Sequence, residues 1–185
     1  MIKDVLKDAS EHMDKTISAL GQEFSSVRTG RASAQIFDKI TVDYYGVPTP
    51  LSQVAAIKSP EPQMLIIEPW DKSVMSVIEK AIQSSDLGLN PSNDGTIIRV
   101  PFPPLTEERR KELVKLCKSY TEEARVAIRN IRRDANDKLK RLEKDGEISQ
   151  DDLHRAEADV QKTTDAHIVR IDEALKRKED EIMEV

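Results

Sequence analysis

The sequence predicts an α+β protein of two domains, a long three-helix bundle and a small α+β domain inserted between its first and second helices. Apolar residues recur at three- and four-residue steps in three long segments, whereas parts of the intervening segment alternate apolar with polar residues. Of the 185 residues, 34% are charged and 4% are aromatic. Such a composition is typical of long amphipathic helices and not of a β-sandwich.

The three segments of helical periodicity cover residues 2–27, 113–142 and 153–182. Thr106 is the expected N-cap of the second helix and Ser149 that of the third. Amphipathic helices of matching period bury their apolar faces most economically against one another, which predicts a left-handed, coiled-coil-like bundle. The apolar positions of the second helix are Leu113, Leu116, Tyr120, Ala124, Ala127, Ile131, Ala135, Leu139 and Leu142.

The period changes between the first and second helices. Residues 40–45 alternate as a strand does, and a turn is expected at Gly46. Pro60, Pro62 and a turn at 90–95 are expected to separate the remaining elements. Further strands are predicted at 53–58, 63–68 and 96–100, and a short helix at 73–84. A small sheet covered by one helix can form a compact domain of its own.

The predicted bundle domain consists of residues 1–30 and 105–185, and the predicted small domain of residues 31–104. Glycine and prolines mark the two connections, near 29–33 and 101–105. Two such chain crossings predict a hinge. The expected hinge residues are Gly30, Arg31, Ala32, Ser33, Pro101, Pro103 and Pro104.

Charge is distributed unevenly along this acidic chain, which has 29 basic and 34 acidic side chains and a net charge of −5. Residues 125–141 hold seven basic and two acidic side chains (+5), whereas residues 143–185 hold seven and fourteen (−7). Helical rotation places Arg125, Arg129, Arg132 and Arg133 on one side, roughly opposite the apolar Ala124, Ile128, Ile131, Ala135 and Leu139. This arginine stripe predicts a face for RNA phosphates, and the alternative is an ordinary solvated helix face.

Other conspicuous residues suggest no chemistry. His12, His154 and His167 lie in separate helical segments, so neither a metal nor an acid–base site is expected. The single cysteine, Cys117, excludes a disulfide framework, fits a reducing cytoplasm and is expected to act as a small hydrophobe. Trp70 is expected to be a lid on the small core. Without a Gly-rich phosphate loop, an apolar run long enough to cross a bilayer or a signal peptide, we expect a cytoplasmic protein with no cofactor and no enzymatic activity.

Five motifs resemble those of the bacterial ribosome recycling factor family. They lie at residues 28–33, 44–51, 81–91, 99–111 and 129–138, in the family's order, and the similarity spans essentially the whole chain. The resemblance implies an L-shaped molecule of tRNA-like outline, in which a three-helix bundle and a β/α/β domain are joined by a flexible two-stranded hinge.

The resemblance also implies a function and a binding face. Members of the family act after termination, when the factor with elongation factor G and GTP splits the ribosome so that its subunits can be reused. The implied partners are the rRNA of the large ribosomal subunit and elongation factor G, and the factor is expected to be a monomer. The RNA-contacting residues that carry over are Arg132, Arg129, Arg133, Arg110 and Arg28.

A second hypothesis belongs to another functional class. The chain could be a helical adaptor that binds protein partners through its acidic C-terminal helix, with the arginines only keeping it soluble. The salt dependence of binding to large ribosomal subunits distinguishes the two hypotheses, because only phosphate contacts make binding steeply salt-dependent.

Overall fold

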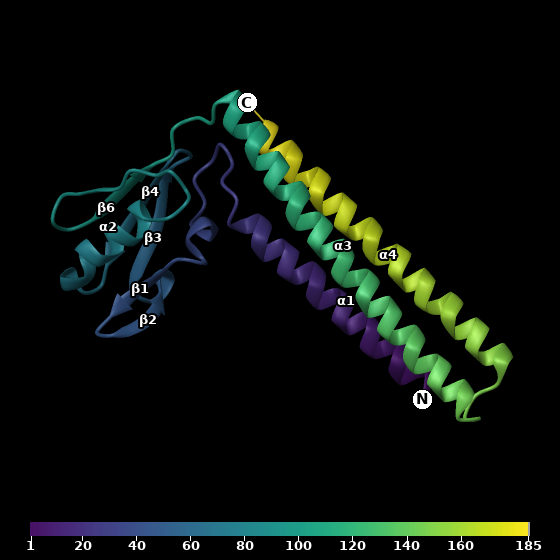
Figure 1. The fold of residues 1–185 in the computed structure, drawn as a ribbon. Coiled ribbons are helices and arrows are strands. Elements are labelled where there is room, and N and C mark those ends of the chain that lie inside the picture. Colours follow the sequence, from purple (N-terminus) through teal and green to yellow (C-terminus); the bar gives the residue numbers. More distant parts are fainter. Residues whose placement is uncertain (185) are drawn as a thin grey trace. The chain divides into compact units, whose positions relative to one another are not determined.

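The computed structural model describes residues 1–184, and three long helices dominate it (Figure 1). They are α1 (Ile2–Ser25), α3 (Glu107–Lys144) and α4 (Gln150–Met183). Between α1 and α3 the chain forms six short strands, helix α2 and three short 3₁₀ helices. In chain order these are η1 (Ala34–Phe37), β1 (Thr41–Tyr44), β2 (Val47–Pro50), η2 (Leu51–Gln53), β3 (Ala55–Glu61), β4 (Met64–Pro69), η3 (Lys72–Val74), α2 (Met75–Gln83), β5 (Ser92–Asn93) and β6 (Ile98–Pro101). The predicted α+β class is confirmed.

The chain forms two compact units. The first consists of residues 1–24 and 115–179, and the second of residues 25–114 and 180–185. The first unit therefore contains most of the three long helices, and the second contains the inserted strands, α2 and the adjoining helix ends. The domain boundaries expected at residues 30 and 105 fall inside the second unit and stay a prediction.

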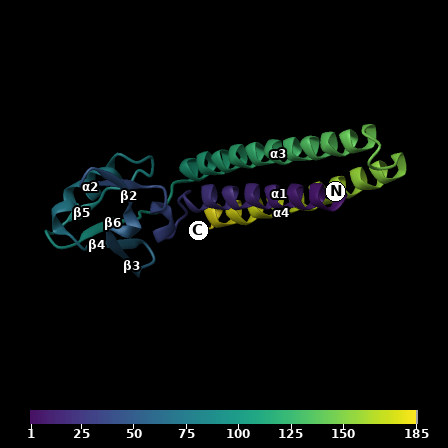
Figure 2. The same cartoon turned by 90° about the horizontal axis from the view of Figure 1, so that it is seen from below.

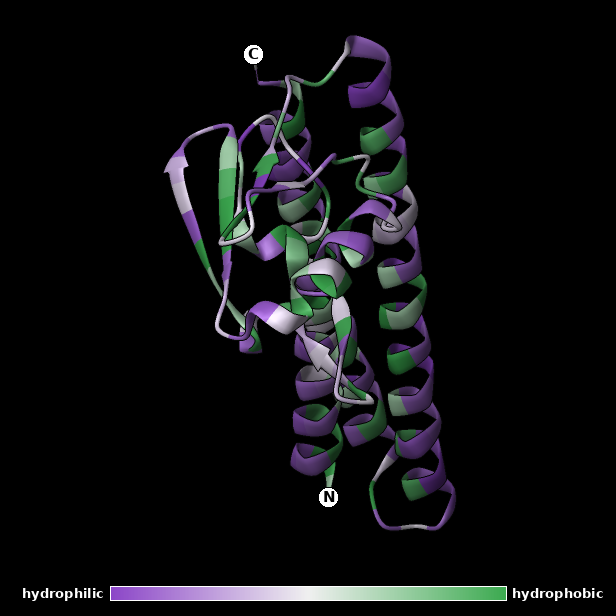
Figure 3. Ribbon diagram, turned by 90° about the vertical axis from the view of Figure 1, so that its left-hand side faces the viewer, coloured by the Kyte–Doolittle hydropathy of each residue, from purple (hydrophilic) through white to green (hydrophobic). Residues whose placement is uncertain are grey.

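Apolar stripes on the three long helices form the core of the first unit. Figures 1 and 2 show these helices running side by side, and Figure 3 shows hydrophilic and hydrophobic residues alternating along each of them, as amphipathic helices require. One buried cluster takes Ala9 from α1, Ala135 and Leu139 from α3, and Leu153, Ala156 and Val160 from α4. Of the described helices, none is long and apolar enough to cross a membrane.

One predicted core position of the second long helix is wrong. Leu116 is 40% exposed, whereas Leu113, Cys117 and Thr121 are buried at four-residue steps. Because each residue rotates the helix by about 100°, Leu116 cannot share a face with its neighbour Cys117. The buried Thr121 satisfies its hydroxyl by donating a hydrogen bond to the Cys117 carbonyl over 2.8 Å, so a polar side chain is accommodated in the bundle core.

Both predicted helix caps are confirmed. Thr106 Oγ1 accepts a hydrogen bond from the Arg109 amide at 3.1 Å at the start of α3. Ser149 Oγ accepts one from the Asp152 amide at 3.0 Å at the start of α4. Each cap satisfies an amide that has no partner within the helix, and this fixes where the helix begins.

The small domain contains a two-stranded and a four-stranded antiparallel sheet. Strands β1 and β2 form a hairpin whose two turn residues, Tyr45 and Gly46, have φ of 50° and 83°. Positive φ at both positions is the geometry of a type I′ turn, which suits the twist of a hairpin. The second sheet has the order β3-β4-β6-β5. Its buried Leu65, Ile67, Ile98 and Val100 share one core with Met75, Ile78 and Ile82 of α2.

Three sequence-based expectations for the small domain are wrong. Strand β3 continues through Pro60, with a register shift between Lys58 and Glu61, because an edge strand tolerates a residue that lacks an amide proton. The expected turn at 90–95 contains a short strand, Ser92–Asn93, paired with β6. Trp70 is 68% exposed and is therefore no lid on the core.

A polar contact links α1 to α4 inside the first unit. The buried His167 ring faces the Thr163 carbonyl through Nδ1 at 2.7 Å and the Asp14 carboxylate through Nε2 at 2.9 Å. Arg170 Nη1 donates to the same Asp14 oxygen at 2.9 Å. The hydrogen bonds from His167 and, secondly, Arg170 hold the pKa of Asp14 below its usual range.

Acid is therefore expected to weaken the link between α1 and α4. A carboxyl whose pKa is lower in the folded than in the unfolded state stabilises the fold above the usual Asp pKa of about 4, and this contribution is lost as the pH falls through the folded-state value. Asp14→Asn should lower the melting temperature at pH 6, and its difference from wild type should shrink as the pH falls below the usual Asp pKa of about 4. Thermal unfolding followed by circular dichroism measures this, with Asp8→Asn on α1 as the control. A difference that does not change with pH would contradict the role given to the Asp14 carboxylate.

Candidate nucleic-acid interface

The arginines of the predicted stripe lie on one uninterrupted helix. The 38 residues of α3 contain neither glycine nor proline, so nothing in its sequence breaks or kinks the helix. Its first turn contains Glu107 and Glu108 and its last turn Arg141 and Lys144, an order that complements the helix dipole. The spacing between the arginines is therefore fixed by helix geometry.

Only part of the stripe borders the core of the bundle. Rotation of about 100° per residue places Arg125 and Arg132 within about 100° of the direction shared by Ala124, Ile128 and Ala135. Arg125 and Arg132 are accordingly half-buried. Arg129 and Arg133 lie farther round the helix and are exposed. The predicted position opposite the apolar face is therefore wrong for Arg125 and Arg132, and it holds for Arg133.

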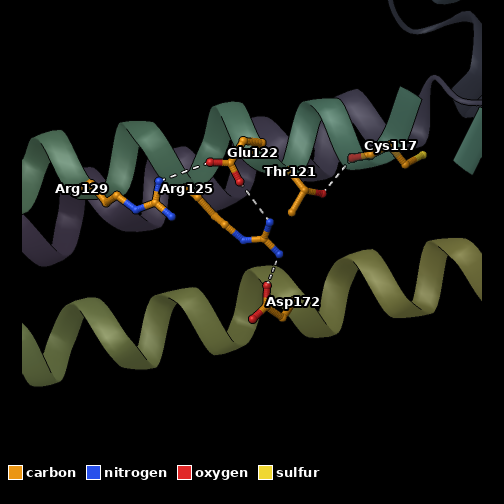
Figure 4. Close-up of polar contacts among 6 residues, drawn as sticks. All are labelled: Cys117, Thr121, Glu122, Arg125, Arg129 and Asp172. Carbon is orange, nitrogen blue, oxygen red and sulfur yellow. Dashed lines mark hydrogen bonds and ion pairs between the residues drawn. The ribbon is translucent and has the colours of Figure 1, made fainter. Parts of the chain in front are cut away.

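Arg125 at the edge of the stripe joins α3 to α4 (Figure 4). Its Nη2 donates to Asp172 Oδ1 on α4 at 2.5 Å, and its Nη1 donates to Glu122 Oε2 at 3.2 Å. Hydrogen bonding to Asp172, which is the largest cause, raises the pKa of Arg125. Two carboxylates already hold this guanidinium, so Arg125 serves the bundle and is poorly placed to bind a phosphate.

The other three arginines have progressively fewer or weaker contacts within the chain, in the order Arg129, Arg132 and Arg133. Arg129 Nη1 donates to Glu122 Oε1 at 3.2 Å, so it shares one carboxylate with Arg125 (Figure 4). Bonds from these two arginines, Arg125 first, lower the pKa of Glu122. Arg132 approaches only the neutral Gln161, with 3.5 Å between Nη1 and Oε1, and a contact of that length is weak. The side chain of Arg133 makes no hydrogen bond or ion pair within residues 1–184.

Among the four stripe arginines, Arg132 and Arg133 are thus the two that have no carboxylate partner within residues 1–184. A guanidinium can grip a phosphate with two parallel hydrogen bonds, and a free one need not break an ion pair to do so. Neighbouring arginines at a fixed helical spacing can contact successive phosphates. Chemically, this part of α3 can bind an anionic polymer.

Arg110 and Arg28 belong to the second unit and already have contacts within the chain. Arg110 Nη1 donates to the Met183 carbonyl at 3.2 Å. Arg28 donates to the Pro103 carbonyl, and its guanidinium carbon lies 5.4 Å from the centre of the Phe102 ring. Arg110 lines a cavity of about 590 Å³, together with residues of both chain crossings, the β3–β4 turn and the end of α4. That all five predicted arginines bind RNA stays a prediction.

With this geometry in place, comparison with known proteins decides the family. The model of the ribosome recycling factor family matches residues 20–183. The chain belongs to the ribosome recycling factor family. Curated relatives include the ribosome-recycling factor of Geobacillus sp. strain WCH70, which is 58% identical with both chains covered in full. The ribosome-recycling factor of Nitratidesulfovibrio vulgaris strain DP4 is 57% identical over 184 residues, 100% of this chain and 99% of the relative.

Solved structures of ribosome recycling factors are also similar. A solution structure of the ribosome recycling factor is 42% identical, with a TM-score of 0.78, over 100% of this chain and 98% of that chain. A second structure comprises models for the Thermus thermophilus factor and the Escherichia coli elongation factor G bound to the Escherichia coli post-termination complex. It is 46% identical, with a TM-score of 0.68, over 99% of both chains. The resemblance noted in the sequence is therefore a true family relationship.

The sequence did not predict the carboxylates that form ion pairs with some of the stripe arginines and leave the others unpaired. Glu122 lies three positions before Arg125, a spacing at which helical side chains meet, so this pair could have been found from the sequence. Asp172 lies 47 residues from Arg125, and only the packing of α4 against α3 brings it there. The sequence alone therefore could not separate Arg125 from its neighbours.

The two ends of the stripe should differ in their effect on stability. Arg125→Met removes the contact between α3 and α4 and should lower the free energy of unfolding by about 0.2–1 kcal/mol, the range for partly exposed ion pairs. Arg133→Met, made on an exposed and unpaired side chain, should leave it unchanged. Chemical denaturation measures both variants. Equal effects would contradict the assignment of Arg125 to the bundle.

Proposed function

We propose that this chain acts after termination of protein synthesis, as the family name implies. It binds the post-termination ribosome through rRNA of the large subunit and, with elongation factor G and GTP, splits the ribosome into subunits for a new round of protein synthesis. It works in the bacterial cytoplasm as a monomer. The observation that carries this proposal is that Arg132 and Arg133 have no carboxylate partner within residues 1–184, whereas the other two stripe arginines, Arg125 and Arg129, do.

In the proposed mechanism α3 presents a preformed basic face. Arg129, Arg132 and Arg133 bind phosphates, whereas Arg125 keeps α3 fixed to α4. Because the helix is packed into a bundle, little conformational entropy is lost when the face meets rRNA. The acidic surface of the rest of the chain repels phosphates, so binding is oriented as well as tight. Arg110 and Arg28 extend the proposed contact only if they leave their present partners.

Splitting requires energy that the chain does not supply itself in this proposal. Its sequence has no Gly-rich phosphate loop, so the partner GTPase provides the energy and the chain catalyses no reaction. The force has to move one part of the molecule against another, which the hinge near residues 29–33 and 101–105 allows. Gly30 does not adopt a positive φ, and a Cβ there would meet no atom within 4 Å. Glycine at this position therefore matters for motion and not for the conformation seen here.

Binding to the large subunit should depend steeply on salt. Each phosphate neutralised contributes roughly 0.7–0.9 log units of affinity per log unit of salt. Arg132→Glu should weaken binding and flatten this slope, while its melting temperature should change little. The matched control is Lys15→Glu, the same charge change at an exposed position on α1. Binding of Arg132→Glu with wild-type affinity and slope would overturn the proposed RNA face and favour the adaptor hypothesis.

A protein whose hinge is locked should bind the large subunit but should not split the ribosome. Gln63 and Glu184 line the same cavity, so cysteines at these positions can be joined by a short bifunctional reagent. The linked protein should keep its affinity for the large subunit and lose the splitting of post-termination ribosomes by elongation factor G and GTP, followed by light scattering. Controls are the same protein without the reagent and each single-cysteine variant with it. Splitting at the control rate would show that motion at the hinge is dispensable.

A further inference from the structure

Both chain crossings of the second unit are fastened to one turn. The Ala32 amide donates to the Pro62 carbonyl at 2.6 Å, and the Phe102 amide donates to the Gln63 carbonyl at 2.7 Å. Pro62 and Gln63 are the two residues between β3 and β4. Adjacent carbonyls of a single turn thus hold the outgoing and the returning chain, so residues 32 and 102 move together with the sheet.

Arg28 fastens the returning chain at a second point. It lies three residues after the end of α1, and its side chain reaches Phe102 and Pro103, 74 and 75 positions away in sequence. Its Nη2 donates to the Pro103 carbonyl, while the guanidinium lies over the Phe102 ring, 5.4 Å from its centre. Phe102 is fully buried in the core of the small domain. Arg28 therefore connects the end of α1 to a residue anchored in that core.

The surroundings of Arg28 are those of a structural side chain. Its Nε is shielded from solvent and has no hydrogen-bond partner. Burial, followed by the nearby charge of Arg109, lowers the pKa of Arg28. An arginine kept in such a place is held by its planar contacts, because stacking on a ring and donating to a carbonyl suit a flat guanidinium better than a lysine ammonium.

We propose that Arg28 is a positioning residue of the hinge, which fastens Phe102 and Pro103 to the end of α1. While this contact holds, residues 28, 32 and 102 are fixed to one another; once it is released, bending is confined to residues 29–31 on the outgoing chain and 104–106 on the returning chain. In the free protein, Arg28 restricts how the chain bends at the hinge before the partner GTPase acts. This functional role rests on the proposed function. In this role Arg28 does not contact rRNA, because its guanidinium is used inside the chain.

The resting orientation can be measured in the free protein. Exposed Ser18 on α1 and Ser76 on α2 are replaced by cysteine and spin-labelled, and the distance distribution is recorded by electron–electron double resonance. The natural Cys117 does not compete for label, since it is fully buried and burial raises its pKa to about 11. The variants are Arg28→Met, which removes both contacts, and Arg28→Lys, which keeps the charge but not the planar group. Arg109→Met is the control for loss of a neighbouring positive charge.

Arg28→Met and Arg28→Lys should both broaden or shift the distance distribution, and Arg109→Met should not. If the spin-label distance distribution of Arg28→Met matches that of the wild type, the proposal is overturned, whether or not the variant binds ribosomes normally. The salt slope of binding to the large subunit is a second readout: Arg28→Met should leave it unchanged, whereas loss of one phosphate contact would lower it by about 0.7–0.9. A lowered slope overturns the statement that Arg28 does not contact rRNA. The distance measurement involves no ribosome, so failure of the proposed function does not affect its outcome.

Discussion

The continuity of α3 is the constraint on which the rest of the structure depends. At 1.5 Å per residue its 38 residues extend for about 57 Å, and no other element of the chain is as long. The helix supplies one wall of the bundle core and the row of arginines, and its capped start fixes where the returning chain crossing ends. A break in α3 would separate these functions, because the arginines keep their spacing only while the helix stays regular.

Ion pairing on this helix decides which charges are available to a partner. The chain has a net charge of −5 and therefore many carboxylates. Glu122 forms ion pairs with Arg125 and Arg129, and Asp172 forms one with Arg125. Arg132 meets only an amide oxygen. The same residue type thus serves structure at one position and stays available to a partner at another, and the difference lies in which acidic side chains lie within reach.

The sequence predicted what local periodicity and capping determine. The three long helices, α2, both caps and most strands follow from side-chain spacing and from polar residues before apolar runs. It failed where contacts between distant elements decide the outcome. Trp70 follows a strand but has no core to cover, Leu116 sits one residue out of register with the bundle, and Arg125 is paired with a residue of another helix. The exposure of Trp70 and the pairing of Arg125 with Asp172 leave no trace in a short window of sequence.

The irregular edge strand β3 has a consequence for how the molecule meets other chains. An open sheet exposes unpaired amides and carbonyls along its outer strands, and these can recruit a strand from a neighbouring polypeptide. Pro60 lacks one of the amide protons that such pairing needs, and the register shift beside it distorts the rest of the row. The opposite edge, β5, is only two residues long. Both edges of this sheet are therefore poor templates for strand addition, which lowers the tendency of the small domain to aggregate.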